Sequence, residues 1–393
     1  MITHKILKVK PDVLKSLRYY ARQRTSMVIE HFEKKSKAKF NVDGKFLKEI
    51  ESSEHELSLE LVREFANLYK FPLSCFLLPR PLKDDLVPTD YRQFPSTQRG
   101  SISPKMALVL RSAQRAQYVI SMLSEVTSNI LPTISLQDDV EEVSLKAREL
   151  LNKAFLTQEK SSNPYKFFSV LRNELERLGL VIMKTSFPLS DARAFSITNE
   201  KPYVIVINNK DGTEFGYSPK IFSLLHEFGH VLLRDGGLCN DFSSENKIRQ
   251  ELFCNAFAGS CLIPKSALNT HLHGKNFNTL SDEDRIEVID DLHKIFLVGG
   301  EVVIRRMHSL KYISADERNQ LIINWNHYAL RYRKNSFVPP LSQPQKCLGK
   351  NGKYYTHSVF NGIARGLLTP EKAVSYLGIK LKHFKGLQNV VLH

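Results

Sequence analysis

Apolar residues recur at helical spacing over most of the chain. Examples are Leu17, Tyr20 and Ala21, and later Leu61 and Phe65, which would each share one face of a helix. The pattern predicts mainly helical structure in 14–76, 105–157, 165–180, 221–233, 250–262 and 282–332. Within the first range, Leu57 and Leu68 are also at helical spacing, and a turn is expected at 41–44. Within the second range, a break is expected at Pro132.

β-branched and other apolar residues form short continuous runs in one central region. The clearest is Tyr203–Asn208, with a strand-like run at Leu180–Lys184 and a third candidate at Ala194–Ile197. Short apolar runs bounded by turn residues are typical of buried strands. The expected fold class is therefore α+β and mostly helical: an N-terminal all-α domain, followed by a domain with a small sheet and a helical C-terminal part.

Prolines suggest where the chain is divided. Five of them fall within 79–104, where they rule out long helices and indicate a linker, and three more lie within 339–344. The expected domains are 1–80 (helical), 81–160 (proline-rich linker and connecting helices), 161–280 (the domain with the small sheet), 281–336 (its helical extension) and 337–393 (a small basic subdomain).

Composition fits a soluble globular protein, with 42% hydrophobic and 25% charged residues. The sequence contains no apolar run long enough to cross a bilayer, and the residues after Met1 lack the features of a secretory signal. The five cysteines form no CxxC pair, so neither a disulfide framework nor a thiolate zinc site is indicated. A cytoplasmic location and no membrane partner are expected.

The net charge of +15 is concentrated at the two ends. Residues 1–46 hold twelve Lys/Arg against four Asp/Glu, and residues 331–393 hold eleven against one. This distribution places any contact with DNA in the basic N- and C-terminal regions. The alternative is that the basic ends only aid solubility.

The candidate chemistry lies in His226-Glu227-Phe228-Gly229-His230, an HExxH sequence. Histidines four residues apart leave the same helix face, where both imidazoles can bind one Zn²⁺ ion. Glu227 would project beside the metal and take a proton from the attacking water. The alternative for a bare HExxH is a pair of structural histidines, but the predicted strand, helix, glycine turn and second helix form the order found in zincins. Residues 161–280 are therefore expected to form a zincin-like metallopeptidase domain, with 281–336 as its helical C-terminal extension.

A catalytic zinc site needs a third protein ligand and one open position. Glu251, at the start of the next predicted helix, is the favoured candidate, as in gluzincins. Asn255 would lie four residues later on the same face, where it could hydrogen-bond a ligand. Asp235, Asp241 and Glu245 are rival ligands, more simply interpreted as solvated loop charges.

Two segments resemble the ImmA/IrrE metallopeptidase family. Phe222–Leu233 is similar to the family's motif helix, and Glu251–Ala258 followed by Leu262-Ile263-Pro264 is similar to its E-x-E-A-N-x-F-A and L-x-x-P pattern. Phe253 and Cys254 depart from that pattern. The resemblance implies that Glu251 is the third zinc ligand. It also implies a protein substrate, with helix-turn-helix repressors in stress responses or mobile elements as the substrate class.

A weaker resemblance covers the N-terminus. Leu47–Pro81 is similar to the end of an Xre-type helix-turn-helix domain, whereas 14–46 matches less well and contains a lysine-rich insertion. DNA binding and transcription regulation are one reading of this domain, and a helical module that binds protein or senses a signal is the other. For the whole chain, the main hypothesis is an active metallopeptidase. The alternatives are a DNA-binding regulator whose zinc domain senses without cleaving, and a peptidase-like scaffold.

Overall fold

The computed structural model describes residues 5–35, 40–82, 102–123, 131–212, 216–233, 244–273, 277–331 and 340–392. The chain divides into two compact units, Met1–Ser112 and Ala113–His393. The division falls within helix α5 (Pro104–Leu123). Much of the predicted 79–104 linker, and the candidate ligands Asp235 and Asp241, lie outside the described residues.

The first unit is a small helical fold with a two-stranded antiparallel sheet. Its elements are β1 (Ile6–Val9), α1 (Pro11–Tyr20), α2 (Thr25–Lys35), α3 (Gly44–Ile50), β2 (His55–Ser58), α4 (Leu59–Tyr69) and the 3-10 helix η1 (Leu73–Leu77). Leu14, Phe32 and Phe65 are among the side chains that fill its core. The helical interpretation of Leu57 was wrong, because this residue pairs with Leu7 in the sheet. Strands of four residues leave too short an alternation to be distinguished from a helical period.

The second unit contains the three predicted central strands, which form one sheet. Strands β3 (Val181–Thr185), β4 (Ala194–Ile197) and β5 (Val204–Asn208) are ordered β3-β5-β4. β3 and β5 are parallel, with Ile182 opposite Ile205, and β4 is antiparallel to β5. β4 is therefore an edge strand of this sheet.

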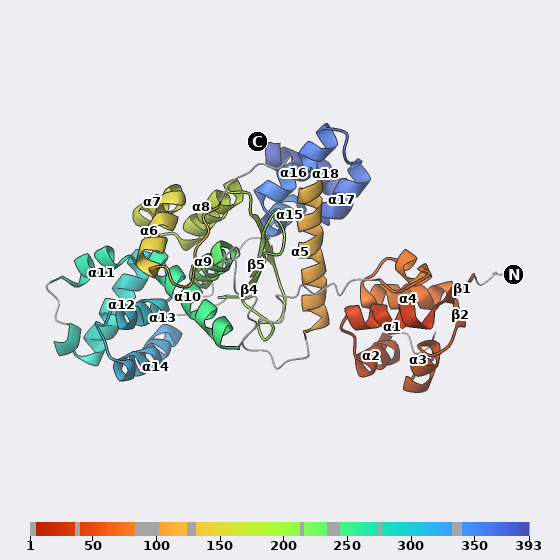
Figure 1. Cartoon of the computed structure of the whole chain (residues 1–393), viewed down its shortest axis with the longest axis horizontal. Coiled ribbons are helices and arrows are strands. Elements are labelled where there is room, and N and C mark those ends of the chain that lie inside the picture. Colours follow the sequence, from red (N-terminus) through yellow and green to blue (C-terminus); the bar gives the residue numbers. More distant parts are fainter. Residues whose placement is uncertain are drawn as a thin grey trace. The chain divides into compact units, whose positions relative to one another are not determined.

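Helices of the second unit cover both faces of the sheet (Figure 1). Ile182, Ile205 and Ile207 join a core cluster with residues of α8 (Pro164–Arg177) and α9 (Ser218–Leu233). The alternate residues Val204 and Val206 are also fully buried. Burial on both faces explains why β5 is apolar throughout rather than alternating.

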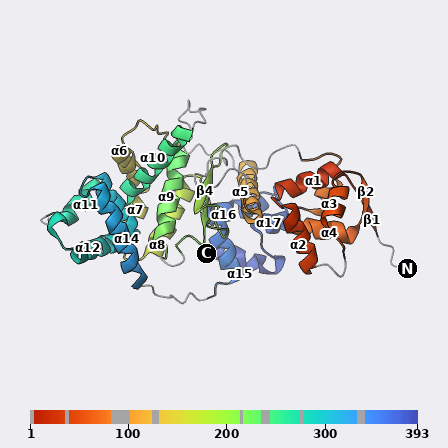
Figure 2. The same ribbon diagram turned by 90° about the horizontal axis from the view of Figure 1, so that it is seen from below.

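The C-terminal segment packs on this unit. Helices α15 (Gln343–Asn351) and α16 (Lys353–Ala364) contact β3, and they lie near α5 and the sheet (Figure 2). The buried Glu176 of α8 accepts hydrogen bonds from the backbone N–H groups of Lys353 and Tyr354, at 2.8 and 2.9 Å. A carboxylate at these first N–H groups of α16 satisfies donors that have no partner within the helix.

The second unit contains further helices. They are α6 (Val140–Leu150), α7 (Asn152–Lys160), α10 (Ser244–Leu262), α11 (Lys265–Leu272), the 3-10 helix η3 (Phe277–Thr279), α12 (Asp282–Phe296), α13 (Gly300–Ser309), α14 (Ala315–Arg331), α17 (Pro370–Leu377), the 3-10 helix η4 (Leu381–His383) and α18 (Phe384–Leu392). The mostly helical α+β prediction is confirmed. No helix among the described residues is both long and apolar enough to cross a membrane.

Candidate metal centre

Helix α9 carries the histidine pair and is buried on most of its surface. It begins at Ser218, three residues before the predicted start, and ends at Leu233 as predicted. Ile221, Leu224, Leu225, Phe228 and Val231 are fully buried in the core shared with the sheet and α8. This packing fixes the rotation of α9 and leaves His226 and His230 together on the remaining, partly accessible side.

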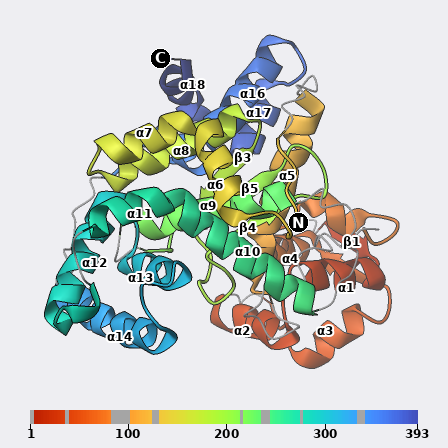
Figure 3. The same ribbon diagram turned by 60° about the vertical axis from the view of Figure 1, so that its left-hand side comes forward.

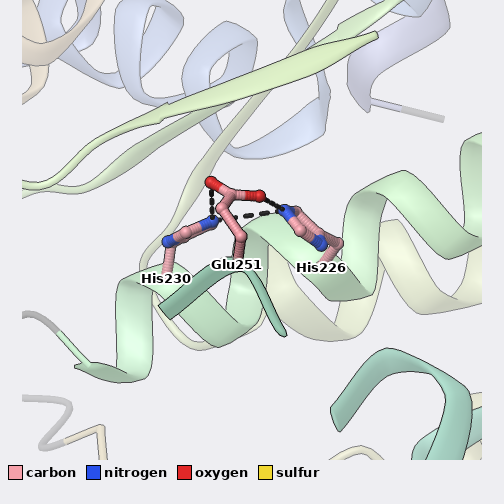
Figure 4. A group of neighbouring side chains, drawn as sticks. All are labelled: His226, His230 and Glu251. Atoms are coloured by element: carbon pink, nitrogen blue, oxygen red, sulfur yellow. Dashed lines mark hydrogen bonds and ion pairs between the residues drawn. The ribbon is translucent and has the colours of Figure 1, made fainter. Parts of the chain in front are cut away.

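Glu251 of α10 faces both histidines (Figure 4). Its Oε2 lies 3.3 Å from Nε2 of His226, and its Oε1 lies 3.4 Å from Nε2 of His230. The two Nε2 atoms are 3.2 Å apart. All three side chains therefore direct a donor atom toward one point, with these atoms within 4.8 Å of one another.

A glycine allows the two helices to approach. Helices α9 and α10 run side by side (Figure 3). A Cβ atom at Gly229 would lie 3.1 Å from Cδ1 of Phe257 and 3.2 Å from Sγ of Cys254, both on α10. A side chain at position 229 would clash with these two residues. The clash would displace the helix that carries Glu251. The glycine within HExxH thus positions the carboxylate as well as the histidines.

Glu227 lies on the same helix as the histidines but is held by the sheet. Its side chain is 7% exposed, and its Oε2 accepts a hydrogen bond of 2.8 Å from the hydroxyl of Ser196 on β4. This bond uses one carboxylate oxygen and orients the group. The other oxygen can accept a proton, which is the role that a general base requires.

The electrostatics of the site favour a cation. Burial raises the pKa of Glu251, but the hydrogen bonds from His226 and His230 outweigh burial and lower this pKa to about 2. The carboxylate therefore stays ionised at neutral pH. Burial lowers the pKa of His230, whereas Cys254, Glu251 and Glu227 raise it well above the usual value for histidine.

The donor set fits a zinc ion. Two imidazole nitrogens and one carboxylate oxygen are the protein ligands of many catalytic zinc sites, where a fourth position stays open for water. A cation between the two Nε2 atoms would accept the lone pair of each deprotonated nitrogen. Among the residues that the structure describes, His226, His230 and Glu251 form the one grouping of this kind.

The other sequence candidates have different positions. Glu245 lies exposed in the first turn of α10 and is not part of the convergent group. Asn255 is exposed, and in the described part of the chain no hydrogen bond joins it to His226, His230 or Glu251. Its role beside the ligands stays a prediction.

Two neighbours of the site were not found by sequence reasoning. The sequence analysis assigned Ser196 only to a strand. The one signal that could have indicated a role for Ser196 was that it is polar within an otherwise apolar, buried run. Cys254 is fully buried, and its thiol raises the pKa of His230. The sequence signal for Cys254 was its departure from the family pattern. Because Cys254 follows Glu251 by three residues, both side chains lie near one face of α10.

Comparison with known proteins assigns the central segment. Residues 175–287 match the family model described as the IrrE N-terminal-like domain, Peptidase_M78. No curated protein and no solved structure matches the chain. The matched residues run from the end of α8 through all three strands, α9 and α10 into α12, so they include every residue of the candidate centre. The part of the chain that carries the metal centre is therefore similar to the metallopeptidases of the ImmA/IrrE family.

Proposed function

We propose that this chain is a zinc-dependent metallo-endopeptidase, with His226, His230 and Glu251 as metal ligands and Glu227 as general base. The observation that carries the proposal is the convergence of three donor atoms beside a buried carboxylate that is oriented by Ser196. A bound zinc ion would supply Lewis acidity toward the scissile carbonyl and would lower the pKa of the attacking water.

The protein groups around the centre would perform the proton transfers. Glu227 takes a proton from the attacking water and returns it to the departing amine. The Ser196 hydroxyl holds Oε2 of Glu227, which leaves Oε1 to accept this proton.

We further propose that the substrate is a protein regulator, with a helix-turn-helix transcriptional repressor of a stress-response or mobile-element system as the expected class. Support for this substrate comes from the family resemblance of the motif helix and of the Glu251 segment. We also propose that the N-terminal unit is an Xre-type helix-turn-helix-like domain. Its supporting features are the short helices α2 and α3, followed by α4 and a proline-bounded aromatic segment.

The proposal is tested by comparing proteomes of cells that express the wild type or the Glu227→Gln variant. We expect at least one protein to be cleaved only by the wild type, while both forms retain about one equivalent of zinc. Glu245→Gln is the matched control, because it makes the same change at an exposed site on α10.

Persistent cleavage by Glu227→Gln would overturn the assignment of the base. If no protein is cleaved by the wild type although zinc is bound, the alternative of a zinc-containing regulator without proteolysis gains support.

A further inference from the structure

A fully buried carboxylate lies in the turn that follows β5, and the chemistry proposed above does not use it. Asp211 is 0% exposed. It follows the last residue of β5, Asn208, by three positions, and its N–H donates to the carbonyl of Asn208 at 3.0 Å. Burying a carboxylate is costly unless its oxygens accept hydrogen bonds. The partners of its two oxygens therefore indicate what Asp211 does.

The two oxygens of Asp211 join different elements. Oδ1 accepts a hydrogen bond of 2.7 Å from Nη1 of Arg193, the residue directly before β4. Oδ2 accepts a hydrogen bond of 2.9 Å from the hydroxyl of Ser223 on α9, which is itself buried. Bonds to an ionised acceptor are stronger than bonds between neutral groups. One carboxylate thus ties the start of the edge strand to the motif helix.

The backbone around Asp211 is held from two further sides. The buried Lys220 of α9 donates from Nζ to the carbonyl of Asp211. The buried Asn208 donates from its side chain to the carbonyl of Ala192 at 3.0 Å, and its N–H donates to the carbonyl of Arg193 at 2.9 Å. The turn after β5, the segment before β4 and the beginning of α9 are therefore joined by hydrogen bonds that leave little freedom to any of them.

This network lies next to the contact that orients Glu227. Ser223 and Glu227 are four residues apart on α9, so their side chains leave the same face of the helix. Ser196, which donates to Glu227 at 2.8 Å, follows Arg193 by three residues along the chain. In the described sheet β4 pairs with β5 only. Its position against α9 therefore depends on side-chain contacts, and those of Asp211 are adjacent to the Ser196–Glu227 bond.

We propose that Asp211 is a positioning residue for the general base. By bonding Arg193 and Ser223 it fixes the start of β4 against α9, so that the hydroxyl of Ser196 meets the carboxylate of Glu227. Asp211 acts through Ser196 rather than on the reacting atoms. The proposal rests on the peptidase function proposed above, and it deepens that function because it names the group that holds the base in place.

The first test measures hydrogen exchange of backbone amides in the zinc-free full chain. Asp211→Asn keeps the shape of the side chain but removes its charge and one acceptor oxygen. Amides in 193–197 should exchange at least about fivefold faster than in the wild type, while those of β3 keep their rate. Glu176→Gln is the matched control, because it makes the same change at another buried carboxylate of the second unit. This control should leave exchange in β4 unchanged.

The second test measures cleavage of the substrate that the proteome comparison identifies. Asp211→Asn should lower kcat by about tenfold, with KM and zinc content unchanged, because only the orientation of the base is lost. Asp211→Asn/Ser196→Ala should be no slower than Ser196→Ala alone, because both changes break the same contact. Glu176→Gln should retain the kcat of the wild type. A purely structural role of Asp211 would instead give multiplied losses in the double variant.

Thermal melting checks that the variants fold. If Asp211→Asn does not fold, Arg193→Gln replaces it, because the Arg193 side chain is 72% exposed and its loss removes one bond of the network. The proposal is overturned if the variant exchanges and cleaves as the wild type does, or if the losses in the double variant multiply. If the wild type cleaves no protein, the peptidase assignment fails, whereas the exchange experiment still decides whether Asp211 holds β4 against α9.

Discussion

At the scale of single residues, the candidate metal centre depends on a small residue as well as on the three candidate ligands. His226 and His230 are brought together by helical spacing alone. Glu251 reaches them because Gly229 lets α10 approach α9 closely, with Cys254 and Phe257 against the glycine. Close packing of this kind leaves little space for one added methyl group.

Gly229→Ala should weaken zinc binding, by about tenfold, because the added Cβ must displace Phe257 or Cys254 and with them the helix that carries Glu251. Competition with a colorimetric chelator measures the affinity. Gly259→Ala is the matched control, since a Cβ there would meet no atom within 4 Å. The control should gain up to about 1 kcal/mol of stability from helix propensity, with unchanged zinc affinity. Equal zinc affinity of Gly229→Ala and the wild type would show that helix spacing does not control the site.

Glu251→Ala should lose zinc during dialysis against a mild chelator, because two histidines alone provide an incomplete set of ligands. Metal content by atomic emission is the measurement, and Glu245→Ala serves as the control. Retention of zinc by Glu251→Ala would redirect the assignment of the third ligand to Asp235 or Glu245.

At the scale of elements, ion pairs hold the helices around the centre. The carboxylate of Glu141 on α6 accepts two hydrogen bonds from the guanidinium of Arg306 on α13, at 2.6 and 2.7 Å, and one from Ser260 on α10. Arg306 is 5% exposed and also donates to the carbonyl of Ile263. Burial raises the pKa of Glu141, but the bonds and charge of Arg306 outweigh this and hold the pKa below its usual range.

Glu141→Gln should lower the free energy of unfolding at pH 7 by about 1 to 2 kcal/mol. The expected loss of stability is modest because the Glu141 side chain is 38% exposed and solvent screens its interaction with Arg306. The pKa of this carboxyl is lower in the folded than in the unfolded state, so its contribution is complete above about pH 4.5 and is lost as the pH falls through the folded value. Denaturant titrations from pH 3 to 7 should therefore show the two proteins converge in acid. A constant difference across this range would exclude the ionised pair as the cause.

At the scale of the whole molecule, the candidate metal centre belongs to one of the two units. The second unit contains this centre and the C-terminal helices, whereas the first unit has its own core and two-stranded sheet. A metal ion bound by His226, His230 and Glu251 would join α9 to α10, and so would stabilise the second unit by mass action.

Removal of zinc should lower the melting temperature of the second unit by on the order of 5 °C, since a hundredfold excess of metal over its Kd contributes about 2.7 kcal/mol. Calorimetry with and without a chelator measures the shift, and readdition of zinc should restore it. Glu251→Ala should show a much smaller shift. An identical shift in that variant would place the stabilising metal elsewhere.

The sequence by itself determined the features that depend on local spacing. The histidine pair on one helix face, the three apolar strands and the mostly helical class follow from periods of 3.6 and 2 residues, which are properties of the chain itself. The sequence also singled out Glu251, which the structure places beside both histidines, although α10 begins at Ser244, six residues before the predicted start. Its role as a metal ligand stays a prediction.

Tertiary structure decided which distant residues meet. The hydroxyl of Ser196 reaches Glu227 because β4 is the edge strand beside α9, and the order β3-β5-β4 is set by pairing between strands that lie apart in sequence. Cys254 contacts His230, and Asn351 closes the end of α17, because helices pack together over long sequence separations. Such contacts depend on how complete faces are buried against one another, and no local pattern of residues specifies that arrangement.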